Sequence, residues 1–221
     1  MTRNAQRAAE REATQPARVP IAQSLPADAR SKLSAYLDLL GKWNRVHNLT
    51  AIRERKQMQL LHVDDALAVL RFLPDAPRLR LLDVGSGGGV PGIPLAIARP
   101  GWDVVLLDSN RKKVSFLTQA AIELRLDNVR PVASRIEDYV GDERFDVVIS
   151  RAFADLASFA RSTRALVAPG GVIVAMKGML PQDEIDALPC DIGVASTPAV
   201  DVPGLDAARH LVIMQPKGGS A

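Results

Sequence analysis

The chain has 221 residues, a hydrophobic fraction of 47% and one cysteine, Cys190. This length suffices for one substantial hydrophobic core with a small accessory element. A single cysteine excludes an internal disulfide and a cysteine-based zinc site, which is typical of a reducing compartment. No apolar run reaches the roughly 18 residues of a membrane span, and the N-terminus lacks the apolar core of a secretory signal. We therefore expect a cytoplasmic protein without a membrane segment.

The net charge of +3 is unevenly distributed along the chain. Residues 1–78 carry 13 Lys/Arg and 8 Asp/Glu, a net charge of +5, whereas residues 79–221 carry −2. The segment 42–56 is the densest part. Its cations are Lys42, Arg45, Arg53, Arg55 and Lys56, against Glu54 alone. Clustered positive charge indicates a polyanion partner, although a solvated helix end and loop would show the same pattern.

The N-terminal third predicts a helical extension over residues 23–78. Residues 1–22 are rich in Ala, Arg and Gln without an apolar period, which predicts a mobile tail. Residues 27–43 place apolar side chains at spacings of three and four, which predicts an amphipathic helix. A loop should follow over 44–52, and a second helix over about 57–72. We expect the inward side chains of this second helix to be Leu60, Leu61, Ala68 and Leu70.

From Leu79 onward, short apolar strands alternate with helices, so residues 79–221 should form one α/β domain. The predicted strands are 79–84, 103–108, 128–133, 145–150, 171–176, about 191–199 and 208–214. The predicted helices are about 91–99, 111–126, 155–167 and 181–188. No helical pattern separates the last two strands, which predicts a terminal antiparallel pair. The expected fold is a doubly wound, mostly parallel seven-stranded sheet of the Rossmann-like class I methyltransferase type.

The stretch LLDVGSGGGVPG, Leu81 to Gly92, reads as a buried strand, a glycine-rich turn and the start of a helix. Glycines let a backbone approach a ligand where a Cβ would clash. The next predicted strand ends in Asp108, where a carboxylate can accept hydrogen bonds from both hydroxyls of a ribose. Together these features predict a nucleoside-containing cofactor at the carboxyl edge of the sheet.

The spacing favours S-adenosylmethionine over a dinucleotide. Gly85, Gly87 and Gly89 are spaced G-x-G-x-G, and Val90 stands where a dinucleotide fingerprint has its third glycine. Asp83 lies two residues before the first glycine, where it would repel a pyrophosphate. S-adenosylmethionine carries an ammonium and a sulfonium instead, so Asp83 suits its methionine end, directly or through water.

The chain resembles the GidB family of 16S rRNA guanine-N7 methyltransferases from about Leu33 to Gln215. The matching stretches are WNRVHNLTAI (43–52), HVDDAL (62–67), DVGSGGGVPGIPLAI (83–97), LLDSNRKKVSFL (106–117), SRIEDY (134–139), FDVVISRAFADL (145–156), MKG (176–178) and RHLVIM (209–214). The glycine loop alone would be weak evidence, whereas this combination is specific. Gly88 departs from the family pattern, in which proline is common at this position, and the tail before about Pro20 has no counterpart.

The resemblance implies methyl transfer from S-adenosylmethionine to N7 of one guanine in the decoding-region loop of 16S rRNA. The family's cofactor positions correspond to Gly85, Val90, Ile136, Glu137 and Arg151 here. Asp83, Gly87 and Asp108 join them on the arguments above. The implied partner is 16S rRNA, the small ribosomal subunit or its precursor.

Guanine N7 has a free lone pair, so the reaction requires orientation of the reactants and no general base. Arg151 follows a strand at the carboxyl edge and should hold guanine O6 or a phosphate. Lys177 could reach phosphate or O6, or lie exposed at its strand end. Asn48, beside the basic segment, could contact the base or order its loop. These three residues are our candidates for substrate positioning.

Two other functions remain open from sequence. A methyltransferase of a small molecule or protein would share the cofactor site, and an assembly factor would bind rRNA without catalysis. His62 and Asp65, at i and i+3, lack a third ligand nearby, so a helix-surface or packing role is expected and no metal. We expect a monomer.

Overall fold

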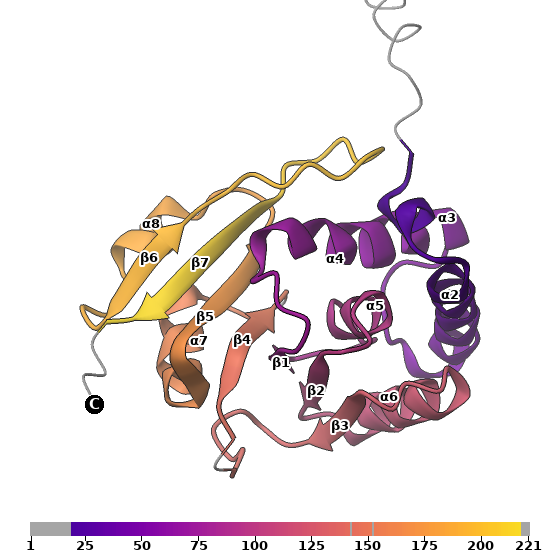
Figure 1. The fold of residues 1–221 in the computed structure, drawn as a ribbon, viewed down its shortest axis with the longest axis horizontal. Helices are drawn as coiled ribbons and strands as arrows, with labels where there is room; N and C mark the ends of the chain where they lie inside the picture. The colour runs from indigo at the N-terminus through magenta and orange to yellow at the C-terminus, as the bar shows by residue number, and fades with distance from the viewer. Residues whose placement is uncertain (1–18, 142, 152, 218–221) are drawn as a thin grey trace, which may run out of the picture.

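The computed structural model describes residues 19–141, 143–151 and 153–217. A seven-stranded sheet lies at its centre, with helices on both faces (Figure 1). Its strands are β1 (Arg80–Val84), β2 (Asp103–Asp108), β3 (Val129–Ala133), β4 (Phe145–Ser150), β5 (Val167–Lys177), β6 (Ile192–Ser196) and β7 (His210–Pro216). The order is β3-β2-β1-β4-β5-β7-β6. Strands β1 to β5 pair in parallel, and β7 pairs antiparallel with β5 and β6, which confirms the predicted sheet.

The central strands are covered on both faces, as their continuous apolar sequences predict. Leu81 faces one hydrophobic cluster and Leu82 the other, following the two-residue period of a strand. The Leu82 side packs against α7 (Leu156–Thr163) and the short η4 (Arg164–Leu166). The Leu81 side packs against α5 (Gly92–Ala98), α6 (Arg111–Glu123) and the N-terminal helices. The short α8 (Gln182–Asp186) follows β5.

Two of these helices begin at side-chain caps that the sequence supplies. The Asn110 side chain accepts a hydrogen bond from the backbone N–H of Lys112 at the start of α6, at 3.0 Å. The Asp155 carboxylate accepts from the backbone N–H of Ser158 at the start of α7, at 2.7 Å. Each cap satisfies a backbone donor that a helix leaves unpaired at its first turn. These caps fix where the chain leaves the carboxyl edge of β2 and β4.

The N-terminal extension begins with η1 (Ile21–Ser24) and α2 (Ala27–His47). A continuous helical segment follows, made of α3 (Arg55–Met58), the π-helical η2 (Gln59–Asp64), α4 (Asp65–Leu67) and η3 (Ala68–Phe72). We call this segment the 55–72 helix. Its residues and those of α2 belong to the same hydrophobic cluster as one face of the sheet. Figure 1 shows the 55–72 helix running from α2 toward β7.

The structure corrects several predicted boundaries in the extension. Most of the predicted tail, 1–22, lies outside the described residues, but Ile21 begins η1 and Ala22 is buried. The predicted loop 44–52 is partly helical, because α2 continues to His47. The second helix is buried at every position from 62 to 69, whereas Leu60, Leu61 and Leu70 are only partly buried. Of the four inward side chains that we expected, only Ala68 is fully buried.

The C-terminal elements differ mainly in length. Strand β5 begins at Val167, four residues before the predicted start. Residues 167–170, which directly follow η4, already belong to the strand. Helix α7 correspondingly ends at Thr163. Within the described part of the chain, no helix is both long enough and apolar enough to cross a membrane.

Candidate functional site: two cavities at the carboxyl edge of the sheet

The turn after β1 depends on glycine at several positions. Gly85, Gly87 and Gly89 have φ angles of 74°, 58° and 87°, in the left-handed region that favours glycine. A Cβ on Gly89 would lie 2.4 Å from Ile93 Cδ1, and one on Gly92 would lie 2.2 Å from Leu106 Cδ2. The glycines therefore allow both the turn and the close packing of α5 against the sheet.

Asp108, at the end of β2, is tied to this turn. Its Oδ2 accepts a hydrogen bond from the backbone N–H of Gly87 at 2.9 Å, and its Oδ1 accepts from that of Asn110 at 2.8 Å. The Lys113 ammonium lies 3.9 Å from Oδ2. A carboxylate offers about four acceptor sites, so these contacts leave capacity for a ligand's hydroxyl groups.

A cleft of about 480 Å³ opens beside this carboxylate, and we call it the loop cleft. It is lined by Val84, Gly85, Leu107, Asp108, Ser109, Lys113, Ser134, Arg135, Ile136, Glu137 and Phe153. The structure thus brings together four of the predicted cofactor residues, Gly85, Asp108, Ile136 and Glu137. Val90 is buried behind the glycine turn and does not line this cleft.

Asp83 lies beneath the glycine turn and is fully buried. Its Oδ2 accepts a hydrogen bond from the backbone N–H of Gly92 at 2.9 Å, which anchors the start of α5. Its Oδ1 has no hydrogen-bond partner among the described residues. Burial raises the pKa of this carboxyl to about 7, although the Gly92 hydrogen bond lowers it. Buried acceptors are normally hydrogen-bonded, so we expect a donor beside this oxygen.

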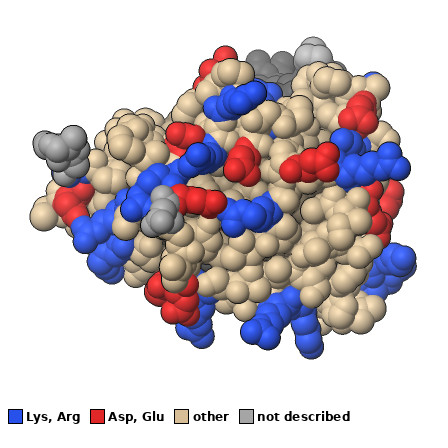
Figure 2. Space-filling view, turned by 60° about the horizontal axis from the view of Figure 1, so that its bottom comes forward, with Lys and Arg blue, Asp and Glu red and all other residues tan. Residues whose placement is uncertain are grey.

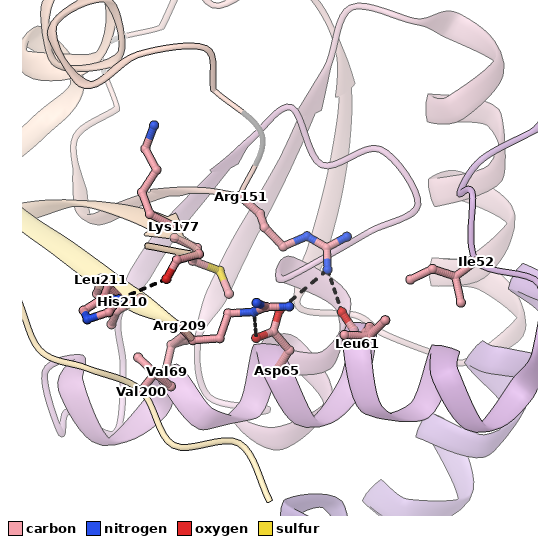
Figure 3. A pocket seen from close by; sticks show the side chains of 12 residues that line it. Ile52, Leu61, Asp65, Val69, Arg151, Lys177, Val200, Arg209, His210 and Leu211 are labelled. Carbon is pink, nitrogen blue, oxygen red and sulfur yellow. Dashed lines mark hydrogen bonds and ion pairs between the residues drawn. The ribbon is translucent and has the colours of Figure 1, made fainter. Parts of the chain in front are cut away.

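A second cavity, of about 310 Å³, lies between the 55–72 helix and the ends of β5 and β7, and we call it the helix cavity. Its lining residues are Ile52, Leu61, Asp65, Val69, Arg151, Met176, Lys177, Gly178, Val200, Arg209, His210 and Leu211 (Figure 3). The two cavities flank the segment after β4, because Phe153 lines the loop cleft and Arg151 lines the helix cavity.

Arg151 is held by the 55–72 helix rather than by the loop cleft. Its Nη1 donates to the backbone carbonyl of Leu61 at 2.7 Å and lies 3.3 Å from His62 Nδ1. Asp65 Oδ2 lies 3.8 Å from the same nitrogen. Burial and the nearby guanidinium lower the pKa of His62 to about 4, so the ring is neutral at pH 7. The carbonyl of Leu61 belongs to the π-helical turn, a feature that often occurs at functional sites.

The Asp65 carboxylate also contacts a second arginine. Arg209, just before β7, donates from Nε to Asp65 Oδ1 at 3.0 Å. Figure 3 shows both arginines converging on this carboxylate, which is 4% exposed. Sequence reasoning assigned Asp65 a helix-surface or packing role and missed Arg209 altogether. Only the structure brings residues 65, 151 and 209 together, since they are far apart in the chain.

The other two positioning candidates lie apart from Arg151. The Lys177 ammonium pairs with Glu184 Oε2 at 2.8 Å and points away from Asp65 (Figure 3). Asn48 is exposed at the C-terminus of α2, with a left-handed φ of 49°, and lines neither cavity. The loop is ordered instead by buried Asn44, whose Oδ1 accepts from the Thr50 backbone N–H at 2.9 Å.

Tyr36 connects the N-terminal extension to the glycine turn, a contact that the sequence did not reveal. Its hydroxyl donates to the Gly88 carbonyl at 2.6 Å, and the residue is fully buried. Burial raises the pKa of this hydroxyl far above its ordinary value, so it remains a donor. Tyr36 lies on the apolar face of its helix, which predicted packing but not a polar contact.

The cations of the basic segment, residues 42–56, do not form a uniformly positive surface. Arg55 lies 3.4 Å from Asp38 and donates to the Ser34 hydroxyl, whereas Arg53 and Lys56 are exposed. On the face shown in Figure 2, Lys and Arg side chains are interspersed with Asp and Glu. Within residues 19–141, 143–151 and 153–217, no group of three or more His, Cys, Asp or Glu side chains could hold a metal ion.

Comparisons with known proteins decide the family. The model of the family described as "GidB: rRNA small subunit methyltransferase G" matches residues 29–212. This chain belongs to the GidB family. It is 53% identical over 186 residues to the ribosomal RNA small subunit methyltransferase G of Neisseria gonorrhoeae, covering 84% of this chain and 88% of that one. It is 52% identical over 189 residues to the Laribacter hongkongensis protein of the same name, covering 86% and 90%.

Solved structures share the fold with the GidB chain. A DhpI–SAH complex aligns with a TM-score of 0.53 at 19% identity, covering 86% of this chain and 97% of that one. The glycopeptide N-methyltransferase MtfA, complexed with S-adenosyl-L-methionine, aligns with a TM-score of 0.58 at 13% identity, covering 71% and 88%. At these identities the likeness shows the fold alone. GidB proteins are S-adenosylmethionine-dependent methyltransferases, so the cofactor predicted from sequence is confirmed for the family.

Proposed function

We propose that this chain transfers a methyl group from S-adenosylmethionine to N7 of one guanine in the decoding-region loop of 16S rRNA. The observation that carries the proposal is the pair of cavities on either side of the segment after β4, in a chain of the GidB family. Ligands of open α/β sheets bind at the carboxyl ends of the strands, where both cavities lie. The loop cleft would take the methyl donor and the helix cavity the acceptor base.

The residues of the loop cleft fit the donor. The glycine turn leaves room for a ligand beside the backbone, and Asp108 retains acceptor capacity for ribose hydroxyls. Asp83 lies beneath the glycine turn and lines neither cavity, but its unpaired Oδ1 suits the ammonium of the donor, reached directly or through water. Glu137, exposed at the cleft, can accept from an adenine amino group next to the Ile136 side chain. Gly87 and Val90 act indirectly, by shaping the turn that carries Gly85.

When bound, S-adenosylmethionine supplies a methyl group on a positively charged sulfur. The chain's own task is then to orient the guanine, because its N7 lone pair needs no general base. Arg151 is held beside the helix cavity by the Leu61 carbonyl, where a guanidinium can donate to guanine O6 without occupying the N7 lone pair. Lys177, paired with Glu184, stays a candidate for phosphate or O6 after that pair opens.

The basic segment would face the rRNA. Ile52 lines the helix cavity, and its neighbours Arg53 and Lys56 are exposed, so these cations lie close along the chain to the proposed acceptor site. Exposed Asn48 belongs to the same loop region and would contact the nucleic acid there. A ribosomal RNA substrate, as naked RNA, precursor or assembled particle, implies a cytoplasmic protein.

Analysis of rRNA from a strain that lacks this protein tests the proposal. Mass analysis of nuclease fragments of 16S rRNA should show the loss of one 7-methylguanosine in the decoding-region loop, and a plasmid copy should restore it. Unchanged 16S rRNA would refute the proposal. Loss of methylation at another atom or in another RNA would keep the methyltransferase activity and reject the acceptor.

A further inference from the structure

We infer that Asp65 selects the acceptor base by accepting two hydrogen bonds from the Watson–Crick edge of guanine, with Arg151 donating to O6 beside it. The inference rests on the proposed function and deepens it, because it names a specificity-determining residue in the helix cavity.

The helix cavity has the composition of a pocket for a planar base. Its walls include the apolar side chains of Ile52, Leu61, Val69, Met176 and Leu211. Its volume of about 310 Å³ lies at the lower end of the roughly 300–1,000 Å³ that is usual for small-ligand sites. Two of its polar groups, the guanidinium groups of Arg151 and Arg209, converge on the Asp65 carboxylate, whereas Lys177 and His210 lie apart from it (Figure 3). Apolar walls with a few convergent polar groups are what fixes the orientation of a bound heterocycle.

Asp65 retains the capacity to accept hydrogen bonds from a ligand. Its Oδ1 is hydrogen-bonded to Arg209 Nε at 3.0 Å. The Oδ2 atom lies 3.8 Å from Arg151 Nη1, a distance longer than a hydrogen bond. Arg151 Nη1 instead donates to the Leu61 carbonyl at 2.7 Å. Burial raises the pKa of this carboxyl, the two arginines oppose that rise, and they leave part of its acceptor capacity unused.

The pattern of donors and acceptors fits guanine. Along its Watson–Crick edge, guanine presents the acceptor O6 and the adjacent donors N1–H and N2–H. Arg151 and Asp65 offer the complement, a guanidinium donor next to a carboxylate with two acceptor oxygens. Adenine, cytosine and uracil each place an acceptor where one of these donors stands, so a carboxylate would be repelled there.

This mode of binding also leaves the reacting atom free. N7 lies on the opposite side of O6 from N1, so a base held by its Watson–Crick edge keeps the N7 lone pair open. The 55–72 helix supports the arrangement, because the Leu61 carbonyl accepts from Arg151 Nη1 at 2.7 Å and the adjacent His62 ring is hydrogen-bonded to the Thr50 hydroxyl at 2.9 Å. The same carboxylate thus selects guanine and orients it.

The test compares methyl transfer to two RNAs by the full-length protein. Small subunits are reconstituted with 16S rRNA that carries either guanosine or inosine at the target position; inosine keeps N7, O6 and N1–H but lacks the N2 amino group. The wild-type protein should favour guanosine by about tenfold or more in kcat/KM, the size of one lost base contact. Asp65→Asn replaces one acceptor by a donor, and should reduce that preference to about twofold or less.

Asp64→Asn is the matched control. Asp64 is the neighbouring buried carboxylate, but it accepts from the Ala22 backbone N–H at 3.0 Å and does not line the helix cavity. This variant should keep the wild-type preference. Calorimetric binding of S-adenosylhomocysteine should be the same for Asp65→Asn and wild type. If Asp65→Asn does not fold, Asp65→Glu replaces it and should lower kcat/KM more for guanosine than for inosine.

The possible failures are distinguishable. Equal transfer to both RNAs by the wild type, or an unchanged preference in a folded Asp65 variant, would overturn this inference and leave the proposed function intact. Absence of transfer to the guanosine-containing subunit by the wild type would overturn the proposed function and this inference with it.

Discussion

Replacing Asp83 by Asn should change how stability depends on pH. Asp83 is fully buried, and one of its two carboxylate oxygens has no hydrogen-bond partner within the described residues. Burial raises the pKa of this carboxyl from 3.8 to about 7. The folded state therefore holds a proton that the unfolded state has released, and stability falls as pH rises between these two values. Asparagine keeps the shape and has no such titration.

The expected size follows from the shift. Each unit of pKa difference corresponds to about 1.4 kcal/mol, so a shift from 3.8 to about 7 costs the wild type roughly 4 kcal/mol at high pH. About 3 kcal/mol of this is lost between pH 5 and pH 8, with little further loss above the folded pKa. The free energy of unfolding of Asp83→Asn, relative to wild type, should therefore rise by about 3 kcal/mol over that range.

Urea unfolding of both proteins at pH 5, 6, 7 and 8, without cofactor, measures this difference. Asp103→Asn, at the exposed start of β2, serves as the control and should follow the wild type. The same Asp83→Asn protein should bind S-adenosylhomocysteine at least tenfold more weakly at pH 8, because a cationic amino group favours the charged carboxylate. Parallel stability profiles for wild type and Asp83→Asn would show that the pKa of Asp83 is not raised in the folded protein.

Three further substitutions test separate parts of the site. Asp108→Ala should weaken S-adenosylhomocysteine binding at least tenfold by calorimetry, whereas Asp103→Ala at the other end of β2 should not; equal affinities would contradict the ribose role. Tyr36→Phe removes a buried hydrogen bond to the glycine turn, so urea unfolding should show a loss of about 1 kcal/mol, with cofactor affinity reduced a few-fold. Asn44→Ala should cost about 1–3 kcal/mol in the same assay, and Asn48→Ala less than half as much; the reverse order would show that Asn48 orders the loop.

The sequence predicted the sheet well because its strands and helices carry local signals. The run Phe145–Ser150 is apolar on both faces, which indicates a central strand. The glycine-rich sequence after Val84 disfavours a helix and indicates a turn. Boundaries were less predictable where a tertiary contact overrides local composition. Helix α2 continues past Trp43 because buried Asn44 gains hydrogen-bond partners in the following loop. A polar residue after an apolar stripe otherwise suggests a loop.

The sequence predicted the residues of the loop cleft better than those of the helix cavity. The loop cleft comes from a single turn and the strand ends beside it, so Gly85 and Asp108 were accessible to reasoning about spacing. The helix cavity depends on Asp65, Arg151 and Arg209, which meet only when the extension packs across the sheet edge. Asp65 in particular reads as a surface or packing residue until the two arginines are placed beside it. No periodicity in the sequence indicates that contact.

Methyl transfer in a purified system is the decisive measurement of the proposed reaction. The protein is incubated with small ribosomal subunits that lack the modification and with labelled S-adenosylmethionine, and the rRNA is then cleaved by borohydride and aniline, which cut at 7-methylguanosine. We expect one methyl group per 16S rRNA, with cleavage at a single guanine of the decoding-region loop. Label that enters 16S rRNA without cleavage there, or no label at all, would show that the protein does not carry out the proposed reaction.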